Sequence, residues 1–256
     1  GTGVIYGDPT GGVFGATAVL TALHHRQRSG EGQLIDLSQR EAFISILPDS
    51  IFEYTMNGRV MESVGNRHAQ FAPHGCYRCK GDDFWVVINV VTEDQFEALC
   101  KVVGENPPTL NGEDVGKLLR APCFKDLASR KLNEDDLDHL IQSWTGKLES
   151  YEVMHLLQKA GIPAGAVLTN QQLLEDPHLQ ARGFFEVVTH PDAGTHPNIG
   201  MPWKLSDTPV HIRLPAPCLG QHNDYILGDI LGVDQVQLER LASKDIIGTE
   251  PLSLRR

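Results

Sequence analysis

The stretch that decides the fold is Asp8-Pro-Thr-Gly-Gly-Val-Phe-Gly15, followed after an apolar run by Ser29-Gly-Glu-Gly-Gln-Leu-Ile-Asp-Leu-Ser38. Apolar residues recur with helical spacing over residues 13–28, and Gly30 and Gly32 end that pattern. A carboxylate therefore stands in a glycine-rich turn at the start of a predicted helix. A large ligand can approach such a turn closely because glycine has no Cβ. An aspartate presented in this way is a candidate nucleophile.

Asp8 also has a structural interpretation. It precedes Pro9, and an aspartate before a proline at the first helical position is a common helix N-cap. Asp176-Pro177 repeats the dipeptide elsewhere in the chain. The two interpretations are compatible, because the N-terminus of a helix stabilises an ionised carboxylate. Both stay open at this point.

Working outward, residues 33–37 are predicted as a short strand. Ser38 then begins a second helix, with Glu41 at capping-box spacing. We expect Pro48 to kink or split that helix and Gly58 to end it.

A compact unit is predicted after residue 74. Two strand-like runs at 75–79 and 84–90 are joined by four polar residues, which is typical of a hairpin. Helices are predicted at 92–103, 118–128, 135–144 and 151–160. The remaining prediction is a short helix at 176–182, a strand at 184–189, an extended wrapping segment at 190–222, and helices at 223–231 and 234–243.

Composition narrows the function classes. The net charge of −11 over 256 residues argues against nucleic acid as a main partner. The apolar runs are far shorter than the roughly 20 residues that span a bilayer, so no membrane partner is predicted. Five scattered cysteines fit a reduced cytoplasmic compartment better than a disulfide framework.

Three further groups are candidate sites. Cys76 and Cys79 form a CxxC pattern, but no second ligand pair follows, and residues three apart on a strand face opposite sides. His190 and His196 flank a turn without further marked ligands, so no metal is predicted. Glu93 lies in a first helical turn, where the helix dipole alone favours an acid.

Taken in order, the motifs resemble the class III CoA-transferase family, often called CaiB/BaiF. The segments that carry this resemblance are residues 7–38, 65–68, 72–77, 87–100, 161–165, 176–184 and 215–222.

The resemblance implies an α/β fold with a Rossmann-like large domain, a small α+β domain, and two subunits that interlock as rings. It places residues 1–58 in the large domain and 59–74 in a linker. Residues 75–150 would form the small domain, 151–164 a linker helix and turn, and 165–256 the return to the large domain with a C-terminal wrapping segment. The chain enters its strongest motif within eight residues of Gly1, so we expect most of the sheet to lie before it.

The resemblance also implies a mechanism. Asp8 matches the nucleophile of the family. In the family's reaction, CoA is transferred from an acyl-CoA to a free carboxylic acid through aspartyl anhydride and aspartyl-CoA thioester intermediates. Gly11 and Gly12 are the expected contacts to the CoA thioester, which is a substrate rather than a tightly bound cofactor. A homodimer is implied. One alternative is an α-methylacyl-CoA racemase-like isomerase, in which Glu93 would assist. Another is a non-catalytic acyl-CoA-binding or pairing half.

Overall fold

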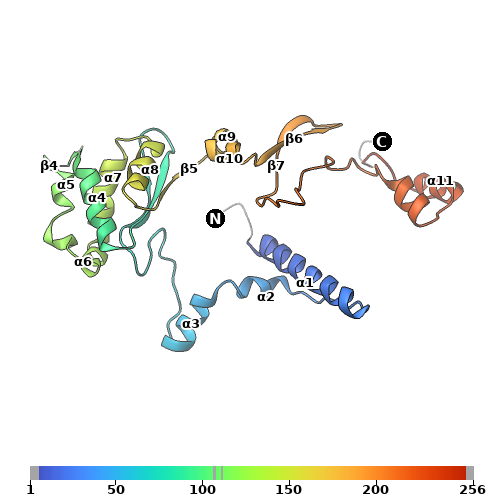
Figure 1. Ribbon diagram of the computed structural model, residues 1–256, viewed down its shortest axis with the longest axis horizontal. Helices are drawn as coiled ribbons and strands as arrows, with labels where there is room; N and C mark the ends of the chain where they lie inside the picture. The colour runs from blue at the N-terminus through green and yellow to red at the C-terminus, as the bar shows by residue number, and fades with distance from the viewer. Residues whose placement is uncertain (1–5, 106–107, 111, 252–256) are drawn as a thin grey trace. The chain divides into compact units, whose positions relative to one another are not determined.

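The computed structural model describes residues 6–105, 108–110 and 112–251. It divides into two compact units, Gly1–His74 and Gly75–Arg256, whose elements are labelled in Figure 1. Within the described ranges, no helix is both long enough and apolar enough to cross a membrane.

The first unit is helical. It contains α1 (Gly7–Ser29), α2 (Gln39–Ile44) and α3 (Pro48–Asn57). Gly30 ends α1 in the left-handed region at φ 78°, with its amide donating to the Arg26 carbonyl. Gly58 ends α3 in the same way at φ 68°. The predicted split at Pro48 is confirmed, because Pro48 is the first residue of a new helix.

For this unit, the structure contradicts one interpretation and one prediction. The N-cap of α1 is Tyr6, so Asp8 lies inside the first turn and does not cap the helix. Residues 33–37 are not a strand, because no described segment pairs with them and a strand needs a hydrogen-bonded neighbour. The predicted cap of the next helix is confirmed, since Ser38 Oγ accepts from the Glu41 amide at 3.3 Å.

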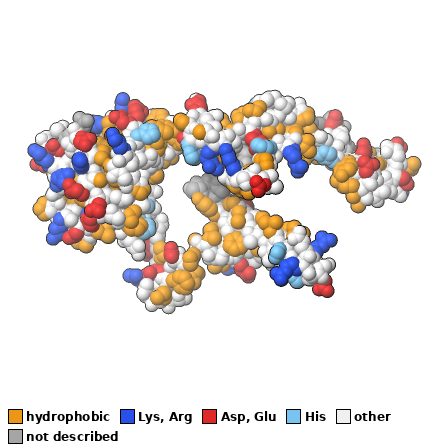
Figure 2. Space-filling model, in the orientation of Figure 1, with side chains coloured by type: hydrophobic (Ala, Val, Ile, Leu, Met, Phe, Trp, Pro, Cys, Tyr) orange, Lys and Arg blue, Asp and Glu red, His pale blue; other side chains and the backbone are white. Residues whose placement is uncertain are grey.

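The apolar side chains of this unit are largely uncovered. Within α1, α2 and α3 only Ala42 is buried, whereas Val13 and Leu20 of α1 are each 67% exposed. Figure 2 shows hydrophobic side chains on the visible surface of these helices. The unit by itself therefore does not bury the apolar faces that its helical periodicity creates.

The second unit begins with the predicted hairpin. β1 (His74–Arg78) and β2 (Trp85–Asn89) are neighbours in a three-stranded sheet, and the Cys79 amide donates to the Phe84 carbonyl at 2.7 Å. β5 (Ala164–Val167) pairs antiparallel with β2, from Trp85 opposite Val167 to Ile88 opposite Ala164. The turn and strand that follow residue 160 thus join this sheet rather than only leading away from it.

Helices cover one face of this sheet. Burial alternates along β2, with Val86 and Ile88 buried and Val87 exposed, as expected for a half-covered strand. α4 (Glu93–Glu105), α7 (Glu134–Thr145) and α8 (Ser150–Lys159) supply much of the core on that face. The fully buried residues of these helices include Leu99, Val103, Leu137, Ile141, Val153 and Leu157.

Shorter elements connect α4 to α7. They are β3 (Thr109–Leu110), β4 (Glu113–Asp114), α5 (Val115–Leu118), the 3₁₀ turn η1 (Pro122–Phe124) and α6 (Leu127–Leu132). The single helix predicted at 118–128 is therefore wrong. Pro122 has no amide hydrogen to continue a helix, and Asp126 starts α6 by accepting from the Ser129 amide at 2.8 Å.

The rest of the second unit is less regular. It contains α9 (Asn170–Glu175), α10 (Pro177–Ala181), β6 (Phe185–His190), β7 (Gly194–Ile199), the π-helix η2 (Asp224–Ile230) and α11 (Gln235–Ser243). The predicted strand at 184–189 is confirmed as β6. β7 pairs with it as an antiparallel hairpin, so part of the segment predicted as extended wrapping is regular strand.

Candidate active site

Asp8 and Asp176 show that one dipeptide serves two purposes. Asp176 caps α10, because its Oδ1 accepts from the Leu179 amide at 2.9 Å. Asp8 is exposed in the first turn of α1, and its Oδ1 instead accepts a hydrogen bond from Gln39 Nε2. The carboxylate of Asp8 is therefore not used to start its helix.

Glycines in α1 make room for Gln39. A Cβ at Gly11 would lie 3.2 Å from Gln39 Cγ, and a Cβ at Gly7 would lie 3.7 Å from Gln39 Nε2. These glycines are four residues apart and share one side of the helix. A Cβ at Gly12 would meet nothing within 4 Å. Of the two predicted CoA contacts, Gly11 lies behind Gln39, whereas Gly12 faces open space.

The surroundings of Asp8 suit a nucleophile. Among the described residues, Gln39 is the only hydrogen-bond partner found for its carboxylate, and no partner is found for Oδ2 of this exposed residue. The residue lies at the N-terminus of a 23-residue helix, whose dipole favours negative charge. Sequence reasoning marked Asp8 as a candidate but did not mark Gln39, its hydrogen-bond partner. The available signal was the Ser38 cap, which makes residue 39 the first of α2 and fixes its direction.

Glu93, the second predicted site residue, is engaged by a buried arginine. Its Oε1 lies 2.7 Å from Nη2 of Arg130, and its Oε2 lies 2.8 Å from Nη1. The hydrogen bonds from Arg130 lower the pKa of Glu93. Asp8 and Glu93 belong to different units.

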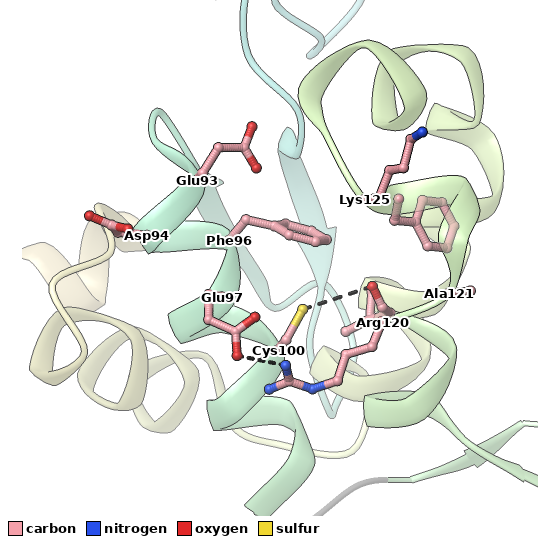
Figure 3. A pocket seen from close by; sticks show the side chains of 10 residues that line it. Glu93, Asp94, Phe96, Glu97, Cys100, Arg120, Ala121 and Lys125 are labelled. Atoms are coloured by element: carbon pink, nitrogen blue, oxygen red, sulfur yellow. Dashed lines mark hydrogen bonds and ion pairs between the residues drawn. The ribbon is translucent and has the colours of Figure 1, made fainter.

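A pocket of about 420 Å³ lies beside Glu93, between α4 and the segment Leu119–Lys125 (Figure 3). The ring of Phe96 projects into it, and the Arg130 guanidinium stacks 4.2 Å from that ring's centroid. Glu97 and Arg120 form a 2.6 Å ion pair at its edge. Two acids of the pocket are thus already paired with arginines, and their arrangement does not by itself favour a ligand.

The CxxC pattern carries no disulfide. All five cysteines are free, and Cys79 is buried. Burial raises the pKa of the Cys79 thiol to about 11, so it stays protonated near neutral pH. The burial of this thiol favours a structural interpretation of the pattern.

His190 has neighbours that the sequence did not mark. Ligand atoms of His190, Asp192 and Cys218 lie within 4.8 Å of one another. However, His190 Nδ1 accepts from the amides of Asp192 and Ala193 at 3.0 and 3.2 Å. The neutral ring therefore carries its proton on Nε2. A metal ion bound by this nitrogen would need its lone pair, which the proton occupies. The geometry favours a hydrogen-bonded turn, in which the Cys218 thiol also donates to Asp192 at 3.3 Å.

Comparison with known proteins gives the same family as the order of the sequence motifs. The family model for CoA-transferase family III matches residues 1–223. The chain belongs to this family.

Two curated relatives of this CoA-transferase family member show how far the likeness extends. A succinyl-CoA–D-citramalate CoA-transferase of Chloroflexus aurantiacus is 32% identical over 96% of the chain and 58% of the relative. A formyl-CoA:oxalate CoA-transferase of Afipia carboxidovorans is 28% identical over 98% of the chain and 62% of the relative. The chain therefore spans about three-fifths of the length of these enzymes.

A solved structure supports the fold. The crystal structure of a CaiB/BaiF family protein from Brucella suis matches with a TM-score of 0.75 at 24% identity. The match covers 90% of this chain and 56% of that one. The mixed α/β architecture is thus that of the family.

Proposed function

We propose that the protein carrying this chain is a CoA-transferase, which moves CoA from an acyl-CoA to a free carboxylic acid through covalent bonds to Asp8. The observation that carries the proposal is the exposure and the hydrogen bonding of the Asp8 side chain. Asp8 is exposed, one of its oxygens is held by Gln39, and its other oxygen has no partner among the described residues. Family membership and transferase relatives support the reaction type.

In the first half-reaction, Asp8 Oδ2 attacks the thioester carbonyl carbon. The carbon–sulfur bond breaks, and CoA leaves as a thiolate while a mixed anhydride forms. The thiolate then attacks Asp8 Cγ and expels the donor acid as a carboxylate. The product is an aspartyl-CoA thioester, so a difficult exchange is split into two easier substitutions.

The second half-reaction passes through the same kinds of intermediate in the reverse order. The acceptor carboxylate attacks Asp8 Cγ and expels the CoA thiolate, which gives an anhydride with the acceptor acid. The thiolate attacks the acceptor's acyl carbon, and Asp8 is released as a carboxylate. CoA is a substrate throughout, and no tightly bound cofactor is required.

Relatives guide the choice of substrates. Enzymes named for succinyl-CoA with citramalate, malate or mesaconate are among those similar to the chain. Succinyl-CoA is therefore the first donor to test, with small dicarboxylates as acceptors. Gly12, which faces open space next to Asp8 in α1, is a proposed contact to the CoA thioester.

We also propose that the protein works in the cytoplasm as an interlocked homodimer. Residues 1–58 and the part of 165–256 that follows β5 would belong to the large domain of each subunit, since β5 pairs with β2 in the sheet of the second unit. The uncovered apolar residues of α1 and α3 support this assembly, because exposed apolar faces of this kind mark surfaces covered by other protein. The free state of all five cysteines supports a reduced compartment.

The isomerase alternative depends on Glu93 as an assisting acid. Both oxygens of that carboxylate accept from Arg130, which gives it a structural partner and keeps it ionised. This arrangement favours the transferase over the isomerase.

Trapping of the covalent intermediate tests the proposal. The intact protein is mixed with succinyl-CoA, rapidly quenched, and treated with hydroxylamine under denaturing conditions. We expect an aspartyl hydroxamate at Asp8 by peptide mass spectrometry, together with exchange of labelled free acid into the CoA ester. Asp8→Asn should abolish both, whereas Asp49→Asn, at the matching position in the first turn of α3, should abolish neither.

Other outcomes identify the alternatives. Deuterium uptake at the α-carbon of an acyl-CoA without acid exchange would establish the isomerase instead. Binding of acyl-CoA with neither reaction, across a panel of donors and acceptors, would leave a binding or pairing half.

A further inference from the structure

Gln39 is the one described residue found to hydrogen-bond to the carboxylate of Asp8, although 31 positions separate them in the sequence. Its backbone is fixed as the first residue of α2, directly after the capping Ser38. Its side chain lies along α1 against Gly7 and Gly11, where any larger residue would meet it. The amide is thus aimed at Oδ1 by the packing of two helices.

We propose that Gln39 orients Asp8 for attack and then donates a hydrogen bond to the negatively charged oxygen that forms at Asp8 Cγ. The inference rests on the proposed function and adds a residue to that site. Because Nε2 holds Oδ1, the attacking atom is Oδ2.

The bond changes explain why Oδ1 matters. In the mixed anhydride, Oδ2 bridges Cγ and the acyl carbon. When the thiolate attacks Cγ, the Cγ–Oδ2 bond breaks and Oδ2 leaves with the donor acid. Oδ1 stays on Cγ and carries the charge of the tetrahedral intermediate. The acceptor carboxylate later attacks the same Cγ, so the charge develops on Oδ1 again.

A donor placed before charge develops stabilises the transition state more than the ground state. Gln39 donates its hydrogen bond to Oδ1, the oxygen that carries the charge in the steps at Cγ. The steps at the acyl carbon of the substrate place the charge on the acyl oxygen instead. Removing the donor therefore slows the steps at Cγ and prolongs the life of the anhydride. A longer-lived anhydride is more often captured by water, which hydrolyses the acyl-CoA.

The test compares Gln39→Met with Gln27→Met, an exposed glutamine of α1 away from Asp8, in the intact protein. For Gln39→Met we expect kcat to fall about 100-fold, with KM for both substrates within about twofold of wild type. The ratio of hydrolysis to transfer should rise. Quenched hydroxylamine labelling at Asp8 should persist. Gln27→Met should match wild type in all four measurements.

Gln39→Glu supplies an independent readout. A second carboxylate within hydrogen-bond distance of Asp8 disfavours ionisation of the pair. The acid limb of the kcat/KM profile should therefore move to higher pH, because Asp8 must be ionised to attack.

The outcomes separate this inference from the proposed function. A wild-type protein without labelling or exchange would refute the proposed function and the role of Gln39 with it. An active wild type with an unchanged kcat and hydrolysis ratio in Gln39→Met would overturn the inference alone. Loss of labelling together with turnover in that variant would also overturn it, because Gln39 would then serve only the local fold.

Discussion

Arg130 and Glu93 form an ion pair in which one partner is buried and the other faces water. The side chain of Arg130 is 2% exposed, whereas that of Glu93 is 58% exposed. The guanidinium also donates to the Phe124 carbonyl at 3.3 Å and stacks on Phe96. The pair ties α6 to the first turn of α4, so Glu93 has a structural task whatever the chemistry of the protein.

Removal of Glu93 should destabilise this region. Glu93→Ala leaves a buried guanidinium with its main partner missing, which we expect to cost about 2 kcal/mol. Amide hydrogen exchange in α4, measured by mass spectrometry on the intact protein, should accelerate about 30-fold. The matched control is Glu97→Ala, one turn further along α4.

Glu97 pairs with Arg120, and both side chains are largely exposed, at 68% and 46%. Its loss should cost less than about 1 kcal/mol, because water replaces the partner in an exposed pair. Equal acceleration of exchange in the two variants would show that burial of Arg130 does not set the strength of the Glu93 pair.

The same pair makes stability depend on pH in the acidic range. Arg130 lowers the pKa of Glu93 in the folded state, while the unfolded chain has an ordinary value of about 4.3. The unfolded state therefore takes up a proton first as pH falls. The stabilising contribution is complete above the unfolded pKa and is lost as pH falls through the lowered folded value.

Glu93→Gln removes this titration. The difference in thermal midpoint between wild type and Glu93→Gln should have its full size at pH 6. It should shrink as pH falls below about 4. Tryptophan fluorescence reports the transition, because Trp144 is buried in the same core. A difference that stays constant down to pH 3 would contradict the assigned ion pair.

The parts of the fold that the sequence predicted are those encoded by neighbouring residues. Pro48 and Gly58 bound α3, and Ser38 caps α2, because each acts within one helical turn. The hairpin of β1 and β2 was predicted from two strand-like runs and four polar residues between them. At residues 118–128 the helical pattern predicts one helix, but Pro122 begins a 3₁₀ turn and Asp126 caps a separate helix.

The parts that the sequence did not predict depend on distant partners. Asp8 is recognisable as a candidate, but its contact with Gln39 spans 31 residues, and the Glu93–Arg130 contact spans 37. Residues 33–37 have a strand-like pattern, yet a strand forms only with a partner, and the described residues offer none. Periodicity describes a face of an element and does not say what covers it.

Gly11 and Gly12 are adjacent in α1 and have the same predicted role, contact with the CoA thioester, but their environments differ. A Cβ at position 11 would press on Gln39 Cγ at 3.2 Å, whereas a Cβ at position 12 would meet no protein atom within 4 Å. Gly11→Ala should therefore lower kcat by displacing Gln39, with little change in KM. Gly12→Ala should raise KM for the acyl-CoA while kcat changes little, since the added methyl occupies space next to the proposed thioester site.

Steady-state kinetics with saturating acceptor acid separate these effects, and thermal unfolding excludes damage to the helix. Alanine is the better helix former by about 1 kcal/mol, so neither substitution should destabilise α1 through backbone propensity. An unchanged KM in Gly12→Ala would show that position 12 does not contact CoA. An effect of Gly11→Ala confined to KM would place that residue against the substrate instead of behind Gln39, because a displaced hydrogen-bond donor acts on the chemical step.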